Sequence, residues 1–188
     1  MSRDTLLITV ISLVSAFAGI WFFQNSIDQP EFISASKNVS HQSKTVGSEA
    51  TEYTFDQIVL KNLNNKFQHL SEWKQPVLIL NFWAPWCAPC RREIPALIEM
   101  QKKYPEKLQI IGLSFDQHEK VRTFAEEFAI NYPLLIVQNE ASKLNTLFGN
   151  HSGGLPFTVI LNKNREIIFQ FSGEISNKSL DKQIMAAL

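Results

Sequence analysis

The two cysteines of this chain, Cys87 and Cys90, are separated by only two residues and directly follow an apolar run, and this arrangement restricts the possible folds. The run is "VLILNFW", over 77–83, and it has the character of a strand buried on both faces. Apolar residues then recur at helical spacing from about 87 to 104, and a second buried strand is predicted over 108–116. Strand, helix and strand in this order imply two parallel strands joined by a right-handed crossover. The cysteine pair therefore lies where a buried strand passes into a helix.

The rest of the pattern predicts an α/β domain over 51–188, in which a central mixed β-sheet is covered by helices on both faces. A short β-hairpin is expected to turn at Asn64–Asn65, where two turn-forming residues separate strand-like segments. Alternating charged and apolar residues predict further helices and strands along the chain. The helices are expected over 118–128, 141–148 and 176–188, and the strands over 132–137, 157–162 and 166–173.

A Cys-x-x-Cys pair at a strand-to-helix junction favours redox chemistry. The free N–H groups and the dipole of a helix N-terminus stabilise an anion, so a thiolate at Cys87 is expected to have a lowered pKa. Cys90, one helical turn later, can attack a mixed disulfide formed at Cys87 and complete a two-electron exchange. A zinc site is disfavoured because the chain has no second cysteine pair and its four histidines show no paired spacing. An inert structural disulfide remains an alternative.

The N-terminus carries an uncharged apolar run over 6–23, which nearly spans a bilayer at helical rise. We expect 1–23 to be a retained signal-anchor helix with Arg3 in the cytoplasm, and 24–50 to be a flexible polar linker. The sequence Ala16-Phe17-Ala18 also fits a signal-peptide cleavage site, so a soluble periplasmic protein is the alternative. In both cases 51–188 would lie outside the cytoplasm, where thiols meet oxidants.

Two segments, "FWAPWCAPCRREIP" and "GGLPFTVIL", resemble the thioredoxin superfamily, specifically its TlpA/ResA-like branch of membrane-tethered disulfide reductases. The resemblance covers 53–188 and implies a thioredoxin-like fold with the helix and strand that this branch inserts, here within 118–149. It also implies that Pro156 follows a cis peptide bond and that the backbone of Leu155 pairs with a substrate strand, as in β-augmentation. Trp86, next to Cys87, is expected to form part of the rim that faces the substrate.

The sequence departs from cytosolic thioredoxins at two positions. Those proteins carry a buried Asp and a Lys near the cysteine pair, whereas the matching positions here are Asn81 and Gly112, which do not titrate. The proton of Cys90 therefore needs another acceptor. Glu93, one turn beyond Cys90, matches a Glu of ResA-like members and is the candidate. A solvated carboxylate in the first helical turn is the alternative interpretation of Glu93.

These observations predict an exported reductase of protein disulfides in which Cys87 attacks the client and Cys90 resolves the mixed disulfide. The expected location is the bacterial cell membrane, with a single span, a periplasmic or other extracytoplasmic domain and a membrane thiol as electron donor. No metal or organic cofactor is expected, and 18 basic against 18 acidic side chains argue against nucleic-acid binding. Rival functions are a disulfide-forming oxidase or isomerase, and a binding module without turnover. Cytochrome c maturation stays open as the cellular role, since "SGGLPFT" lacks the Glu of the matching segment in such proteins.

Overall fold

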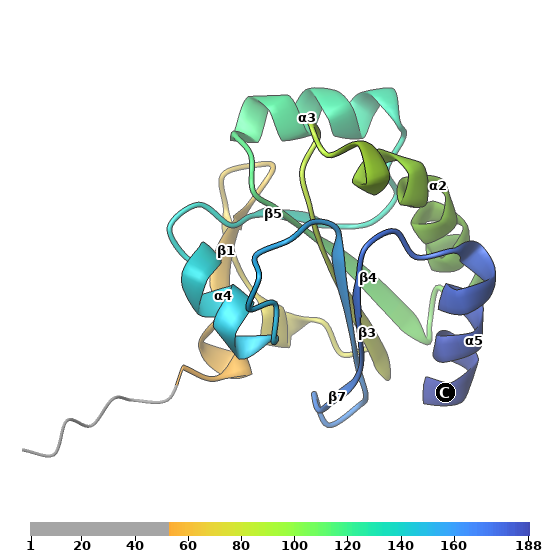
Figure 1. The fold of residues 1–188 in the computed structure, drawn as a ribbon. Helices are drawn as coiled ribbons and strands as arrows, with labels where there is room; N and C mark the ends of the chain where they lie inside the picture. The colour runs from red at the N-terminus through yellow and green to blue at the C-terminus, as the bar shows by residue number, and fades with distance from the viewer. Residues whose placement is uncertain (1–52) are drawn as a thin grey trace, which may run out of the picture. The chain divides into compact units, whose positions relative to one another are not determined.

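A seven-stranded mixed sheet forms the centre of residues 53–188, which are the part of the chain that the computed structural model describes (Figure 1). Its strands are β1 (Val59–Asn62), β2 (Phe67–His69), β3 (Val77–Trp83), β4 (Leu108–Ser114), β5 (Leu134–Ile136), β6 (Phe157–Leu161) and β7 (Ile167–Ser172). They follow the order β2-β1-β5-β4-β3-β6-β7 across the sheet. β4 runs parallel to both β3 and β5, whereas the other neighbouring pairs are antiparallel.

Helices cover both faces of this sheet, as predicted. They are α2 (Ala88–Lys103), α3 (His118–Glu127), α4 (Ala141–Leu147) and α5 (Asn177–Ala187), with the short 3₁₀ turns η1 (Phe55–Gln57) and η2 (Leu70–Glu72). The apolar sides of α2, α3 and α5 belong to one buried cluster, which includes Leu97, Phe124 and Ile184. On the opposite face, Leu70 of η2 and Leu144 of α4 belong to a second cluster.

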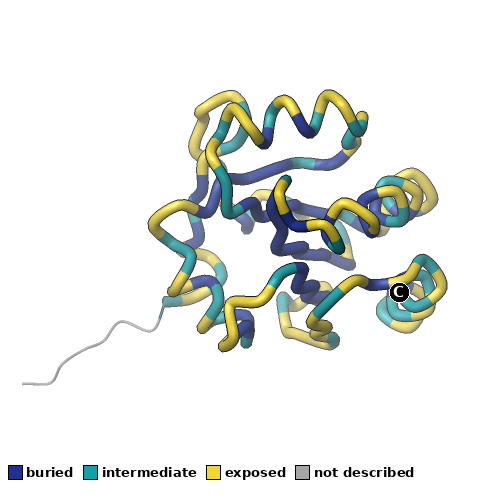
Figure 2. The backbone as a smooth tube through the Cα atoms, turned by 45° about the horizontal axis from the view of Figure 1, so that its top comes forward, coloured by how far each residue is buried: buried dark blue, intermediate teal, exposed yellow. Residues whose placement is uncertain are grey.

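β3 contributes to both clusters because its side chains alternate between the two faces. Ile79 and Trp83 point into the cluster beneath α2, whereas Leu80 and Phe82 point into the other one. All seven residues of the strand are buried, which explains the uninterrupted apolar sequence of this segment. In Figure 2 the buried backbone follows the central strands of the sheet, and the exposed parts lie on the outer sides of the helices, in the loops and in the edge strands β2 and β7. The strand that leads to Cys87 is therefore fixed from both sides.

The predicted hairpin at Asn64–Asn65 is confirmed, with Asn65 in the left-handed region at φ 59°. The side-chain oxygen of Asn62 accepts hydrogen bonds from the N–H groups of Asn64 and Lys66, at 2.9 and 3.1 Å. The predicted anchor over 1–23 and the predicted linker over 24–50 lie outside the described residues. Between 53 and 188, no helix combines the length and the apolar character that crossing a membrane requires.

Candidate active site

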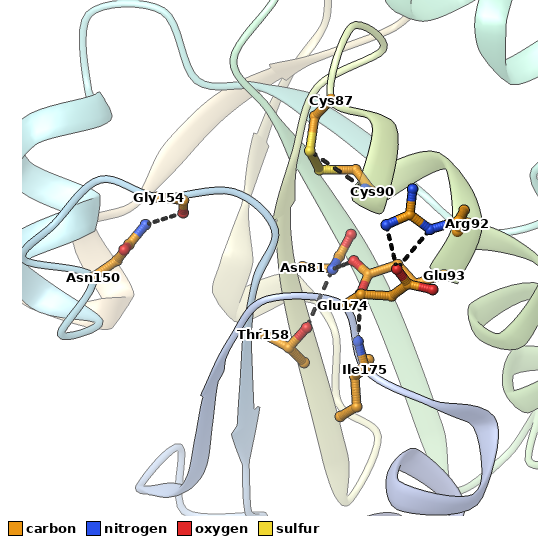
Figure 3. The surroundings of a disulfide bond; sticks show 10 residues. All are labelled: Asn81, Cys87, Cys90, Arg92, Glu93, Asn150, Gly154, Thr158, Glu174 and Ile175. Carbon is orange, nitrogen blue, oxygen red and sulfur yellow. Dashed lines mark hydrogen bonds and ion pairs between the residues drawn. A yellow bond between two sulfur atoms is a disulfide. The ribbon is translucent and has the colours of Figure 1, made fainter.

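The turn between β3 and α2 positions the two cysteines. Cys87 is the N-cap of α2, with extended backbone at φ −82° and ψ 105°, and its sulfur accepts a hydrogen bond from the Cys90 N–H at 3.3 Å. The two residues form a disulfide with their Cα atoms 5.3 Å apart (Figure 3). Cys87 is 5% exposed and Cys90 is fully buried, so a second sulfur can reach the pair only from the side of Cys87. This asymmetry supports the predicted order of attack.

Leu155 and Pro156 lie beside this turn, at the same end of the sheet. The peptide bond between them is cis, which confirms the prediction made from the resemblance. Register places Phe157 of β6 opposite Phe82 of β3, and Pro156 is therefore next to the end of β3 from which the cysteine turn leaves. The backbone N–H and carbonyl of Leu155 have no hydrogen-bond partner within residues 53–188. These groups can therefore pair with an incoming strand.

Trp86 is 67% exposed and stands immediately before Cys87, as expected for a residue that faces a substrate. It borders an open hollow of about 410 Å³ between the cysteine turn and α3. Arg91 lines the same hollow, and its guanidinium lies over the rings of Phe124 and Phe128, at 5.4 and 5.5 Å from their centroids. The surface next to Cys87 therefore presents an exposed indole and a cation held against aromatic rings.

Glu93 is almost completely buried beneath the disulfide, and the alternative of a solvated carboxylate is therefore wrong. Its Oε1 accepts a hydrogen bond from Asn81 Nδ2 at 2.7 Å, and its Oε2 accepts one from the Ile175 N–H at 3.0 Å (Figure 3). Asn81 Nδ2 also donates to Thr158 Oγ1 at 3.3 Å. The carboxyl group is thus held by β3 on one side and by the loop before α5 on the other.

Burial raises the pKa of Glu93 to about 7, and the nearby Glu174 carboxylate acts in the same direction. The hydrogen bonds from the Ile175 N–H and from Asn81 oppose this rise because they stabilise the charged form. A carboxyl group with such a pKa exchanges protons at neutral pH. Glu93, one turn beyond Cys90, can therefore serve as the predicted acceptor of the Cys90 proton.

The two departures from cytosolic thioredoxins lie side by side in the structure, since Asn81 of β3 pairs with Gly112 of β4. A Cβ atom at Gly112 would lie 2.5 Å from Leu134 Cδ2 and 2.9 Å from Trp83 Nε1. The space for a larger side chain is therefore already occupied. Sequence reasoning noted Asn81 only as a residue that cannot titrate and did not anticipate its bond to Glu93. The available signal was a polar residue inside an otherwise apolar strand.

Residues 53–188 contain no group of three or more His, Cys, Asp or Glu side chains placed to hold a metal ion. The prediction that no metal or organic cofactor takes part is not tested by this observation. The described groups near the cysteine pair are those of a thiol–disulfide site: two sulfurs, a buried carboxyl and an exposed aromatic ring.

Comparison with known proteins agrees with this geometry. The profile of the AhpC/TSA family matches residues 46–172, more than half of the chain. The thioredoxin-like protein YneN of Bacillus subtilis is 31% identical over 149 residues, covering 77% of this chain and 84% of that protein. The thiol-disulfide oxidoreductase ResA of Bacillus thuringiensis is 28% identical over 183 residues, covering 96% and 95%. A solved thioredoxin-related protein from Neisseria meningitidis superposes with a TM-score of 0.62 at 32% identity, covering 68% of this chain and 97% of that one.

Proposed function

The chain belongs to the AhpC/TSA family and is a thiol–disulfide oxidoreductase with a thioredoxin-like fold, and we propose that it works as a reductase of disulfides in exported proteins. One observation carries the catalytic part of this proposal. Cys87 is the N-cap of α2 and the more accessible member of a disulfide whose other half is fully buried. The N–H groups of the first helical turn stabilise a thiolate at Cys87, and the burial of Cys90 reserves it for the second step.

The reaction begins when the Cys87 thiolate of the reduced protein attacks one sulfur of a client disulfide. A bond forms between Cys87 Sγ and that sulfur, and the other client sulfur leaves as a thiolate and takes a proton from water. Glu93 then accepts the proton of the Cys90 thiol, and the Cys90 sulfur attacks Cys87 Sγ. The second client sulfur leaves, the Cys87–Cys90 disulfide forms, and two electrons have passed to the client.

We propose that the client lies as an extended segment along Leu155 and Pro156. The unpaired backbone groups of Leu155 support this assignment, because main-chain hydrogen bonds hold such a segment without requiring a particular sequence. Trp86, whose indole is exposed, would contact the client on the side of the cysteine pair that faces away from Leu155 and Pro156. Hydrogen bonds from the backbone and contact with one aromatic ring suit clients of varied sequence.

The proposed location is outside the cytoplasm, with 1–23 as a membrane anchor, 24–50 as a linker and 51–188 as the catalytic domain. The uncharged run over 6–23 supports this organisation. An oxidising compartment does not re-reduce the disulfide, so the proposal includes a membrane thiol protein as electron donor. Maturation of cytochrome c and maintenance of thiols in exported proteins are the cellular roles that this chemistry would serve.

A trapping experiment tests the catalytic assignment. The variant Cys90→Ser should accumulate a mixed disulfide between Cys87 and a disulfide-bonded client peptide, because the resolving thiol is missing. Cys87→Ser should form no such adduct, which non-reducing gels and mass spectrometry would show. A binding module without turnover would bind the peptide equally well in both variants and form no covalent product.

The reduction potential decides the direction of electron flow. A value below roughly −220 mV, on the thioredoxin side of the scale, supports the reductase. A value near −120 mV, as in strong disulfide donors, would overturn it in favour of a disulfide-forming oxidase. The potential is measured by equilibrating the chain in glutathione or dithiothreitol buffers and quantifying the free thiols.

A further inference from the structure

Asn81 is a buried amide whose hydrogen bonds are incomplete. It is fully buried in β3, between Leu80 and Phe82, and its Nδ2 group uses both of its N–H bonds, one toward Glu93 and one toward Thr158. Its Oδ1 atom is also buried and has no hydrogen-bond partner among the described residues. Buried acceptors without a partner are rare in folded proteins, so this oxygen calls for an explanation.

The arrangement satisfies only one protonation state of Glu93. The carboxylate accepts from Asn81 Nδ2 and from the Ile175 N–H, and both contacts stabilise the negative charge. A protonated Glu93 carries an O–H donor, which an NH₂ group cannot accept. A half-turn of the Asn81 amide would place Oδ1 where Nδ2 now lies, and the oxygen could then accept this proton. The oxygen without a partner in one state would thus have one in the other.

Thr158 permits such a turn because a hydroxyl both donates and accepts. Its side chain is fully buried on β6, directly opposite Asn81 in the register of β3 and β6. It accepts from Nδ2 in the structure, and it can donate to Oδ1 once the amide has turned. Valine at this position would have the same shape but no hydroxyl.

We propose that Asn81, supported by Thr158, is the positioning residue that lets Glu93 gain and lose its proton, with the amide donating to the carboxylate and turning to accept from the carboxylic acid. The inference rests on the proposed function, in which Glu93 accepts the proton of Cys90. Asn81 touches neither sulfur nor client, and acts through Glu93 alone. Glu93 can thus take up the proton of Cys90, although Asn81 and Gly112 stand where cytosolic thioredoxins carry an Asp and a Lys and do not titrate.

Few other ionisable groups surround Glu93, so its titration can be followed separately. They are Cys90 and Arg92 on α2, Tyr132 just before β5 and Glu174 in the loop before α5. Glu174 is paired with Arg92 at 2.7 Å, and burial raises the pKa of Tyr132 far above neutral pH. In the disulfide form Cys90 does not titrate either. Around neutral pH the signal of this cluster therefore belongs to Glu93.

The test is a pH titration of the full-length chain in its disulfide form, with ¹³C-labelled Glu carboxyl groups observed by NMR. Glu93 is assigned by the loss of its signal in Glu93→Gln. We expect Asn81→Leu to raise the pKa of Glu93 by about one pH unit or more, because a hydrogen bond to the charged form is lost. Thr158→Val should raise it by a smaller amount, and the matched control Thr158→Ser should stay within about 0.3 pH unit of the wild type.

The side-chain amide of Asn81 gives a second readout, because its NH₂ group donates directly to the Glu93 carboxylate. Its NH₂ resonances should shift with the same midpoint as Glu93 in the wild type and become independent of pH in Glu93→Gln. A Glu93 pKa that is unchanged in both Asn81→Leu and Thr158→Val would overturn the inference, and Thr158→Val alone decides if Asn81→Leu does not fold. Because the titration needs no client, a reduction potential in the range of strong disulfide donors together with the expected shifts would reject the reductase and keep the role of Asn81.

Discussion

At the scale of single residues, Glu93 is the group whose ionisation affects stability most directly. An unfolded Glu has a pKa of 4.5, whereas burial raises the pKa of Glu93 to about 7 in the folded chain. Below pH 4.5 the carboxyl is protonated in both states and burial carries no charge penalty. As the pH rises to 7 the unfolded state loses its proton first, so the folded state is progressively disfavoured. The difference in pKa corresponds to about 3 kcal/mol.

We therefore predict that Glu93→Gln gains stability relative to the wild type as the pH rises from 4.5 to 7.5, by about 3 kcal/mol over this range. Urea unfolding of the disulfide form at several pH values measures the difference, and all other carboxyl groups cancel in the comparison. The control is Glu106→Gln, since Glu106 is exposed on the surface. Parallel stability curves for Glu93→Gln and the wild type would contradict the prediction.

Gly112 tests whether space limits the choice of residue beside Asn81. A Cβ atom would lie 2.5 Å from Leu134 Cδ2 and 2.9 Å from Trp83 Nε1, both in the buried cluster beneath α2. Gly112→Ala should therefore lower the free energy of unfolding by about 1–3 kcal/mol through overpacking. Gly154→Ala is the matched control, because its Cβ would meet only Ser152 Oγ, at 3.4 Å. Urea unfolding measures the stability of both variants. Equal free energies of unfolding for Gly112→Ala and the wild type would show that the side chains of Leu134 and Trp83 can move to make room for the Cβ atom.

The sequence predicted that the cysteine pair lies where a strand passes into a helix and that Glu93 follows one turn later in the same helix. It did not predict that Glu93 is buried. Spacing within one helix depends on local periodicity, which the sequence shows directly. Burial of the carboxyl depends on Asn81 and on the Ile175 N–H, which is 82 residues away in the chain. No local pattern indicates a contact over that distance, so a solvated side chain remained a reasonable alternative.

At the scale of elements, the sequence predicted the strands and helices that have a regular apolar period. β3 and α2 differ from their predicted ranges by at most one residue at each end. The 3₁₀ turn η1 was not predicted, because its three residues show no period. Such turns are held by specific contacts, as where the Leu70 N–H at the start of η2 donates to the Ile58 carbonyl at 3.1 Å. β5 is shorter than predicted and ends with Ile136, where its pairing with β4 stops.

β7 is an edge strand with an unprotected apolar surface. It lies at one end of the strand order, and its sequence "IIFQFS" contains no charged residue. Ile167 and Ile168 are 41% and 45% exposed, and Phe171 is 38% exposed. Natural edge strands usually carry a charge, most often Lys, that prevents pairing with another chain. β7 lacks this protection and is the expected site of association between copies at high concentration.

We predict that Ile168→Lys reduces concentration-dependent association of the fragment 51–188 and changes its free energy of unfolding by less than about 0.5 kcal/mol. Light scattering over a concentration series measures the first effect and urea unfolding the second. Met185→Lys is the control, since it introduces the same charge at a 60% exposed apolar residue of α5, away from the sheet edge. Equal association of both variants and the wild type would show that β7 does not mediate it.

At the scale of the whole molecule, the two buried clusters lie on opposite faces of the sheet, Leu155 packs against both, and the cysteine pair belongs to one of them. The succession of strands and helices along the chain predicted that helices would cover both faces, and this was correct. Which helix covers which face could not be read from the sequence, because α4 shows the same apolar spacing as the helices on the other side. The order of the strands in the sheet and the handedness of the crossovers decide which face each helix covers. Both depend on contacts between segments that are far apart in the sequence.

The coupling between fold and disulfide leads to a last prediction, which concerns the stability of the complete domain in its two redox states. A protein that donates disulfides is more stable when reduced, because its fold favours the open thiol form. A reductase shows the opposite order. Here the disulfide closes within the first turn of α2, above the buried Glu93, and this cross-link restricts the unfolded chain.

The disulfide form should therefore be the more stable one at pH 7, by about 2 kcal/mol for a loop of this length. Urea unfolding of the oxidised and the dithiothreitol-reduced domain, each observed by circular dichroism, measures the difference. If the reduced form unfolds at the higher urea concentration, the fold itself favours the thiols, and the protein would then oxidise its clients instead of reducing them.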